Sequence, residues 1–298
     1  MAEFRAATGT QPAFLDALLE RGLLIASGVP GLYGRSAVFE DVRLRFVEAV
    51  RRVAAIDAPE RLAFPPLIPR EQLDQLGYLK TFPHLAGVVT GFGPGDDGGL
   101  HEQPAGVALT PAACYPVYPA IAARGPVPAG GVTVEATQGC VFRNEPSDDP
   151  ARMQLFHQLE MVRIGAPEVV MAWRDRWRDD AVALLCGLGL DAQHAVASDP
   201  FFGRAGRILA RGQRQQELKF EVLAPLAGDE PTAVASFNAH QAHFAEVYGL
   251  QAEDGTPVHT ACLGFGQERV VLALLHQHGL DPDAWPAAVR AQLWGNDG

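Results

Sequence analysis

The apolar residues near the N-terminus recur at three- and four-residue spacing. This spacing predicts two helices, a short one over residues 11–25 and a stronger one over residues 37–55. The run from Leu62 to Pro69 is apolar and ends in proline, which lacks the backbone N–H that the interior of a sheet requires. We therefore expect a long helix followed by an extended segment that closes at a proline.

Farther along the chain the apolar runs become short, as strands require. They predict strands over residues 106–109, 131–135, 139–144, 155–164, 217–223 and 231–237. Residues 91–105 are rich in Gly, Asp and Pro and predict a loop or flexible tip, and residues 146–150 predict the tip of a hairpin. Helical patterns predict helices over residues 167–190, 239–248, 266–278 and 282–293. Because strands and helices do not alternate regularly, we expect one α+β domain over residues 1–298, an antiparallel sheet flanked by helices.

Composition limits the partners of this domain. The net charge is −11, whereas nucleic-acid binders obtain most of their affinity from Lys and Arg contacts to phosphate. The chain has two lysines, Lys80 and Lys219, so a broad tRNA-binding face is disfavoured. No apolar run approaches the length of about 18 residues that a membrane span requires. Scattered cysteines and a start without a leader sequence predict a protein of the reducing cytoplasm.

Two short patterns each place an arginine among groups suited to a nucleotide. Arg143 and Glu145 precede the hairpin, and Phe156 lies on the returning strand. Gly264 and Arg269 belong to a Gly-x-Gly-x-x-Arg pattern that opens an apolar helix. A guanidinium binds phosphate oxygens in bidentate fashion and stacks on rings. Taken singly, an Arg–Glu pair on a strand is more often a solvated ion pair, and Gly-x-Gly is more often a tight turn.

Taken together and in this order, the patterns resemble the three signature motifs of class II aminoacyl-tRNA synthetases. The helix over residues 37–55 with its proline-ended strand is similar to motif 1, which implies a homodimer. The first arginine pattern resembles motif 2, which implies that Arg143 holds the α-phosphate of ATP. The same resemblance implies that Glu145 reads the adenine amino group and Phe156 stacks on adenine. The second pattern resembles motif 3, in which Arg269 would cover the other face of adenine and reach the γ-phosphate.

The seryl-type members of that class imply two further polar residues. Glu221 matches the carboxylate that holds Mg²⁺, and Asn238 matches the polar ligand near it. In such a site a carboxylate attacks the α-phosphate of ATP and pyrophosphate leaves. Arginines and Mg²⁺ are the natural stabilisers of the charge that develops.

Cys114, Glu160 and Cys262 form a second constellation, although their local spacing is not a zinc signature and buried cysteines are mostly small hydrophobes. Glu160 lies on the strand that returns from the hairpin and Cys262 on the strand that enters the third motif, so both should line one pocket. From about residue 31 to the C-terminus, the chain resembles zinc-dependent seryl-tRNA synthetases and the amino acid:[carrier protein] ligases. This resemblance implies a Zn²⁺ ion whose open fourth position binds the amine of a small amino acid, glycine or alanine. Four nearby histidines are expected to be structural, namely His157, His240, His243 and His259.

The acceptor is predicted from the segments that surround this core. Seryl-tRNA synthetases hold tRNA with a separate N-terminal domain, whereas here an extension over residues 1–30, which is not basic, precedes the first motif. The carrier-protein ligases instead imply transfer to the phosphopantetheine thiol of an acidic carrier protein. Residues 195–216 form the most basic local run, and we expect a helical insertion there that docks the carrier. Its arginines recur at helical spacing and are Arg204, Arg207, Arg211 and Arg214.

Other hypotheses remain open at this point. A truncated seryl-tRNA synthetase paralogue would keep the same chemistry and charge tRNA or another acceptor. A catalytically idle paralogue would serve as an amino-acid sensor, although such a protein has no need to keep Arg143, Glu145, Glu221 and Arg269 together. The arginines of residues 195–216 would, in the simplest alternative, form a solvated face with no partner. The leading hypothesis is a homodimeric ligase that uses ATP, a small amino acid and a carrier protein, without tRNA or a membrane.

Overall fold

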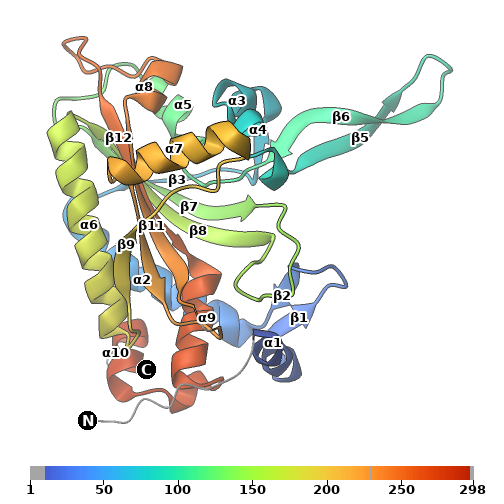
Figure 1. Ribbon diagram of the computed structural model, residues 1–298, viewed down its shortest axis with the longest axis vertical. Coiled ribbons are helices and arrows are strands. Elements are labelled where there is room, and N and C mark those ends of the chain that lie inside the picture. The colour runs from blue at the N-terminus through green and yellow to red at the C-terminus, as the bar shows by residue number, and fades with distance from the viewer. Residues whose placement is uncertain (1–10, 229, 296–298) are drawn as a thin grey trace.

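A seven-stranded sheet forms the centre of the computed structural model, which describes residues 11–228 and 230–295 (Figure 1). Its strand order is β3-β7-β8-β12-β11-β10-β9, and all neighbours are antiparallel except the parallel pair β3 and β7. The strands are β3 (Glu60–Ala63), β7 (Val132–Phe142), β8 (Leu155–Gly165), β9 (Gln193–Val196), β10 (Lys219–Ala224), β11 (Thr232–Gln241) and β12 (His259–Gly266). The predicted α+β fold with an antiparallel sheet is confirmed.

One face of this sheet is covered by helices. They are α1 (Gln11–Glu20), α2 (Ala37–Ala54), α6 (Pro167–Gly187), α9 (Gln267–His278) and α10 (Ala287–Trp294), with the short 3-10 helices η1 (Ala55–Asp57) and η3 (Pro282–Ala284). Alternate residues of β8 and β12, such as Met161 and Leu263, are buried against these helices in the largest core cluster. Because side chains alternate along a strand, Glu160 and Cys262 point to the opposite face.

The opposite face is covered over part of its area by two short helices. α5 (Val117–Ala122) and α8 (His243–Tyr248) pack on β7, β8 and β12 in a second core cluster. The rings of Tyr118 and Phe244 stack with their centroids 3.8 Å apart and join the two helices. The rest of this face, over β8, β12, β11 and β10, borders a cavity.

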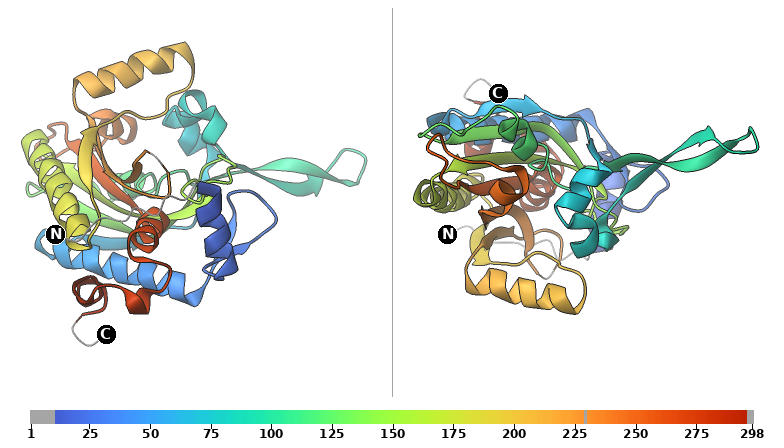
Figure 2. Two further views of the ribbon diagram at one scale, coloured as in Figure 1. Left: turned by 60° about the horizontal axis from the view of Figure 1, so that its bottom comes forward. Right: turned by 90° about the horizontal axis from the view of Figure 1, so that it is seen from above.

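A small three-stranded sheet beside the main one carries a long hairpin arm. Its strands are β4 (Leu67–Pro69), β5 (Val88–Pro94) and β6 (Leu100–Leu109), in the order β4-β6-β5. Short helices join them, namely α3 (Arg70–Gln75), α4 (Tyr78–Thr81) and η2 (Pro83–Leu85). The arm projects from the body of the molecule (Figures 1 and 2). Of the loop or flexible tip predicted over residues 91–105, residues 95–99 do form the turn, but the rest belong to β5 and β6. The prediction is wrong for these strand residues, because an exposed hairpin does not need the apolar alternation by which strands are recognised.

Several predicted boundaries also differ from those observed. The first helix ends at Glu20 instead of residue 25, because the chain turns at Gly22 with φ +66° and continues into β1 (Leu24–Ala26), which pairs with β2 (Tyr33–Arg35). The strands predicted on either side of residue 137 are one strand, β7, whose register shifts between Ala136 and Gly139. The extended run 62–69 divides between β3 and β4, which lie in different sheets.

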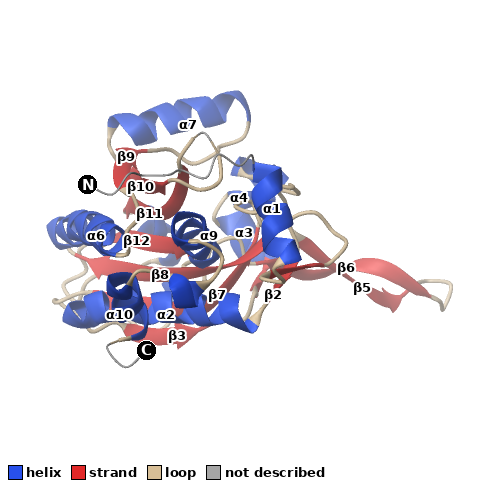
Figure 3. Cartoon of the chain, turned by 90° about the horizontal axis from the view of Figure 1, so that it is seen from below, coloured by secondary structure: helices blue, strands red, loops and turns tan. Residues whose placement is uncertain are grey.

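The basic segment 195–216 contains the end of β9 and the helix α7 (Gly203–Gln215). This helix stands apart from the main sheet (Figure 3). Its buried residue is Gly206, where a Cβ atom would lie 2.7 Å from the backbone of Phe201. None of the described helices has the length and apolar composition needed to cross a membrane.

Candidate active site

Strand pairing aligns the polar residues of the open sheet face in two rows. The rows are Glu160–Gly264–Ser236–Glu221 and Cys262–Asn238–Lys219. Residues that are paired across neighbouring strands present their side chains on the same face. The structure thus places two sequence-predicted groups, Glu160 and Glu221, at opposite ends of one row, with Cys262 and Asn238 in the adjacent row.

Cys114, Glu160 and Cys262 come together at one end of this face. One potential ligand atom from each lies within 4.8 Å of the others, and all three residues are buried. Cys114 reaches the site from the segment between β6 and α5, and its backbone N–H donates a hydrogen bond to the carboxylate of Glu160. Gly264 leaves the room that this carboxylate needs, since a Cβ atom there would lie 2.9 Å from Glu160 Oε1.

The three groups are acidic, and their charges oppose one another. Burial, followed by the charge of Cys262, raises the pKa of Glu160 to about 8. A hydrogen bond between the two thiols raises the pKa of Cys114 and lowers that of Cys262. Full ionisation of two thiols and a carboxyl in one buried place requires a cation. Two thiolates, one carboxylate and an open fourth position fit Zn²⁺.

The groups around Cys262 include one histidine that was expected to be structural. His240 Nε2 lies 3.5 Å from Cys262 Sγ, and its Nδ1 lies 3.1 Å from Thr260 Oγ1. Asn238 Nδ2 lies 3.6 Å from the same sulfur. Both side chains therefore contact a candidate metal ligand. His240 is two residues from Asn238 on β11, so their shared parity is the sequence signal that links them.

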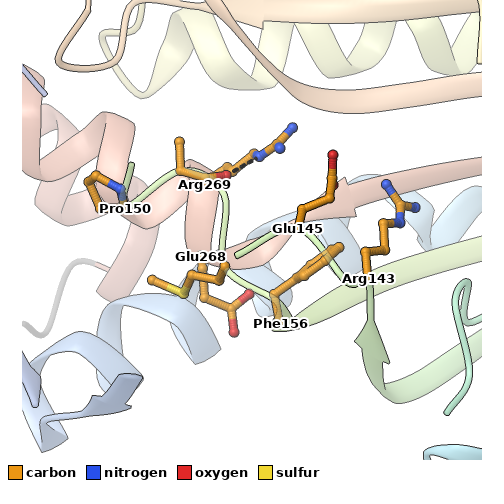
Figure 4. Close-up of a pocket in the computed structure, with 8 residues that line it drawn as sticks. Arg143, Glu145, Pro150, Phe156, Glu268 and Arg269 are labelled. Carbon is orange, nitrogen blue, oxygen red and sulfur yellow. Dashed lines mark hydrogen bonds between the residues drawn. The ribbon is translucent and has the colours of Figure 1, made fainter. Parts of the chain in front are cut away.

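Four of the predicted nucleotide residues line one cavity, as Figure 4 shows: Arg143, Glu145, Phe156 and Arg269. Arg143 follows β7, donates from Nε to the carbonyl of Pro111 at 3.3 Å, and places its guanidinium carbon 5.5 Å from the ring centre of Phe156. Arg269 lies in the first turn of α9 and donates to two carbonyl oxygens, those of Ala151 at 2.7 Å and Ala233 at 2.9 Å. These hydrogen bonds fix both guanidinium groups at the wall of the cavity.

Positive charge is concentrated at this end of the cavity. Burial, and then repulsion from Arg143 and Arg152, lowers the pKa of Arg269 to about 10. Arg152 was missed in the sequence because it follows the turn-rich hairpin tip; its guanidinium lies 3.7 Å from the carboxylate of Glu145. Three guanidinium groups that repel one another are suited to a polyanion such as a triphosphate.

Glu268, adjacent to Arg269, has a different function in the fold. Its carboxylate accepts hydrogen bonds from the backbone N–H and Nδ1 of His157, at 2.8 and 2.7 Å, and from Arg35 at 3.0 Å. Figure 4 shows it pointing away from the two guanidinium groups. These contacts hold the start of α9 against β8 and so set the position of Arg269.

The candidate magnesium ligand Glu221 is paired with a lysine. Lys219 Nζ lies 3.0 Å from Glu221 Oε1 and 2.6 Å from Asp199 Oδ1. Neither Lys219 nor Asp199 was recognised in the sequence as a site residue, because they lie twenty positions apart and meet through the fold. Both line the larger cavity, about 620 Å³ in volume, which also contains the cysteines and the arginines. This volume lies within the usual range for small-molecule sites, about 300–1,000 Å³.

The candidate docking arginines lie on the outer face of α7. Arg204, Arg207, Arg211 and Arg214 are exposed, and helical geometry places them opposite Gly206 and Gln213. Arg214 donates to Ser198 Oγ at 2.7 Å. Within residues 11–228 and 230–295, the other three form no ion pair. Their charges are therefore available to an acidic partner.

Comparisons with known proteins agree with this geometry. A solved structure of M. kandleri SerRS in complex with A. aeolicus tRNASec matches with a TM-score of 0.79 and 20% identity, over 96% of this chain and 61% of that chain. The fold is that of a class II aminoacyl-tRNA synthetase catalytic core. Amino acid–[acyl-carrier-protein] ligases 1 and 2 of Bradyrhizobium diazoefficiens are each 43% identical to the chain, over 94% and 89% of it and over 91% and 84% of their own lengths. The chain therefore belongs to the amino acid–[acyl-carrier-protein] ligase family and is a ligase. No protein-family model matches it.

Proposed function

We propose that this ligase activates a small amino acid, glycine or alanine, with ATP and transfers it to the phosphopantetheine thiol of a carrier protein. One observation carries the proposal: a buried triad of groups that could ligate a metal ion and a cluster of guanidinium groups line the same cavity. The names of the two Bradyrhizobium relatives support an amino acid and a carrier protein as the two joined partners.

The buried triad serves the amino-acid end of the cavity. A Zn²⁺ ion held by Cys114, Glu160 and Cys262 would supply a Lewis-acid position for the free amine of the substrate. Next to it, the rings of His240 and Phe244 meet edge to face with centroids 4.8 Å apart. We infer that these rings close the end of the cavity and restrict the substrate to a small side chain.

The guanidinium end serves ATP. Phe156 stacks on one face of adenine and Arg269 covers the other, while Glu145 accepts a hydrogen bond from the adenine amino group. Glu221 would hold the Mg²⁺ ion that accompanies ATP, and Asn238 extends this polar wall toward Cys262. These roles follow the class II resemblance, and the shared cavity supports them.

The reaction then proceeds in two displacements. A carboxylate oxygen of the amino acid attacks the α-phosphorus of ATP, and the bond to pyrophosphate breaks. Arg143 lines the same cavity as Glu160 and Arg269. We infer that Arg143 stabilises the negative charge on the α-phosphoryl oxygens. The carrier thiolate next attacks the carbonyl carbon of the adenylate, forming the thioester and releasing AMP.

The proposal also covers the molecule that accepts the amino acid and the oligomeric state of the enzyme. The arginine face of α7 docks an acidic carrier, tRNA is not an acceptor, and α2 with the segment after it forms a homodimer. Amino-acid-dependent exchange of pyrophosphate into ATP tests the activation step, with activity expected for glycine or alanine. Labelled amino acid offered to a phosphopantetheinylated carrier and to tRNA tests the acceptor, and sedimentation tests the dimer. Absence of exchange with every amino acid would refute the activation step, and charging of tRNA alone would refute the choice of acceptor.

A further inference from the structure

Four polar side chains form a continuous line from α7 to the floor of the cavity. Gln213, on the inner face of α7, exchanges two hydrogen bonds with Asp199: Gln213 Nε2 donates to Asp199 Oδ2 at 2.8 Å, and Asp199 N–H donates to Gln213 Oε1 at 2.7 Å. Asp199 Oδ1 accepts from Lys219 Nζ at 2.6 Å. Lys219 Nζ then pairs with Glu221 Oε1 at 3.0 Å.

This line matters because α7 has few other attachments. At its N-terminal end, Phe201 stacks on Phe82 with centroids 5.2 Å apart, and Phe202 lies against His84 at 5.7 Å. Along the helix itself, Gly206 is the buried residue. Toward the C-terminal end, Arg214 donates to Ser198 Oγ at 2.7 Å, and Gln213 bonds to the adjacent residue, Asp199. These hydrogen bonds hold the C-terminal half of α7 on the body of the enzyme, and those of Gln213 connect it to the buried charges of the cavity.

The line contains one positive charge and two negative charges. Lys219 is 7% exposed and carries one positive charge between two carboxylates. Burial acts to lower its pKa, but Asp199 and Glu221 outweigh that effect and the pKa of Lys219 is raised. Burial likewise acts to raise the pKa of Asp199, and Lys219 reverses it, so this pKa is lowered. The ammonium thus stays charged and is shared by the two carboxylates.

A divalent cation at Glu221 changes how Lys219 divides its ion pairing between Asp199 and Glu221. A cation that binds this carboxylate repels the ammonium group 3.0 Å away and takes over the negative charge that held it. Asp199 then becomes the remaining partner of Lys219. Because the opposite oxygen of Asp199 binds Gln213, a firmly held Asp199 also holds α7.

We propose that Asp199 and Lys219 are positioning residues that couple occupation of the nucleotide pocket to the seating of α7. The inference rests on the proposed binding of Mg·ATP at Glu221. With the pocket empty, Lys219 is divided between the carboxylates and α7 is loosely held; with Mg·ATP bound, Lys219 pairs with Asp199 and α7 becomes ordered. Because coupling between two sites is reciprocal, a carrier that binds the ordered α7 strengthens ATP binding by the same factor.

Amide hydrogen exchange along α7 tests this coupling in the full-length enzyme, with and without Mg·ATP and in the absence of amino acid. In the wild type, exchange over residues 203–215 should slow about five- to tenfold on addition of Mg·ATP, the lower end of typical couplings. Gln213→Ala cuts the line at its exposed end without leaving a buried charge unpaired, and it should abolish the response. Lys219→Met should do the same. Lys80→Met replaces the other lysine of the chain, which is exposed, and should leave the response intact.

Calorimetric titration of the same samples with Mg·ATP separates the possible failures. If ATP binds and exchange over α7 is unchanged, the coupling is refuted while the ATP site stands. If Gln213→Ala responds as strongly as the wild type, the line through Asp199 is refuted. If ATP does not bind, the proposed function fails and the coupling fails with it.

Discussion

Each end of the cavity crowds groups that repel one another when charged, acidic groups at one end and basic groups at the other. At one end, two thiols and a carboxyl are buried together, which raises the pKa of Glu160 to about 8. At the other, burial and then repulsion among three guanidinium groups at one wall lower the pKa of Arg269 to about 10. Each end is suited to a ligand of the opposite charge, a divalent cation at the acidic end and a polyphosphate at the basic end. In the proposed function, this difference would orient an amino acid between the two ends, its amine toward the metal and its carboxylate toward Arg143.

The largest effect should follow from breaking the acidic end. Cys262→Ala removes one of the three candidate ligands, so bound zinc and pyrophosphate exchange should both fall close to zero. Metal analysis of the purified protein, together with the exchange assay, measures this outcome. Cys186→Ser is the matched control, because Cys186 is exposed and outside the cavity lining. A Cys262→Ala protein that keeps its metal and its activity would show that the triad does not bind the catalytic metal.

Breaking the cationic end should leave the metal in place. Arg143→Ala removes a donor aimed at the developing charge, so the exchange rate should fall by about 10²–10³-fold. Zinc content should be unchanged because the triad is intact. Arg124→Ala provides a control, since this exposed arginine pairs with Glu60 outside the cavity. A loss of metal in Arg143→Ala would mean that the two ends are not independent.

A smaller effect is expected outside the cavity, on α7. The double variant Arg207→Glu/Arg211→Glu reverses the docking face and should lower kcat/KM for the carrier about tenfold, as expected for two exposed charge contacts. Pyrophosphate exchange should stay at the wild-type level, because activation does not involve the carrier. Raising the salt concentration should reduce the difference between the two proteins. Equal loss of exchange and transfer would argue against docking.

The smallest effect concerns stability in the metal-free enzyme. Between its ordinary pKa of 4.5 and about 8, Glu160 keeps a proton in the folded state that the unfolded chain has released. Stability should therefore fall as pH rises through this window. After treatment with a chelator, we expect the thermal midpoint at pH 8 to lie a few degrees below that at pH 5.5. Glu160→Gln should flatten this trend, and an unchanged slope in that variant would assign it to other groups.

Long, strongly patterned elements could be predicted from the sequence far better than short or exposed elements and contacts between distant residues. α2, β8 and α9 were predicted nearly to their observed ends, because each is long and strongly patterned. The arm of β5 and β6 was missed, since its residues are exposed and rich in Gly and Pro. β9 and the short helices α3 to α5 were also missed, because a few residues carry too little periodicity.

The candidate site shows the same division. Arg143, Glu145, Phe156 and Arg269 stand in short patterns, and the structure brings them to one cavity. Arg152, Asp199 and Lys219 line the larger cavity as well, but none of them stands in a pattern that separates it from an ordinary surface charge. Resemblance indicated Cys114, Glu160 and Cys262, because their spacing alone carries no metal signature.

By itself the sequence determined the long, strongly patterned elements and the chemical groups available: thiols and carboxyls, guanidinium groups and a basic segment in an acidic protein. Tertiary structure decided which of those groups meet. β8 and β12 are about a hundred residues apart in the chain, yet their pairing sets Glu160 against Gly264 and brings Cys262 beside it. The register of β10 and β11 likewise sets Lys219 opposite Asn238. Such pairings depend on the packing of the whole core, since a shift of one residue would turn every site side chain to the opposite face of the sheet.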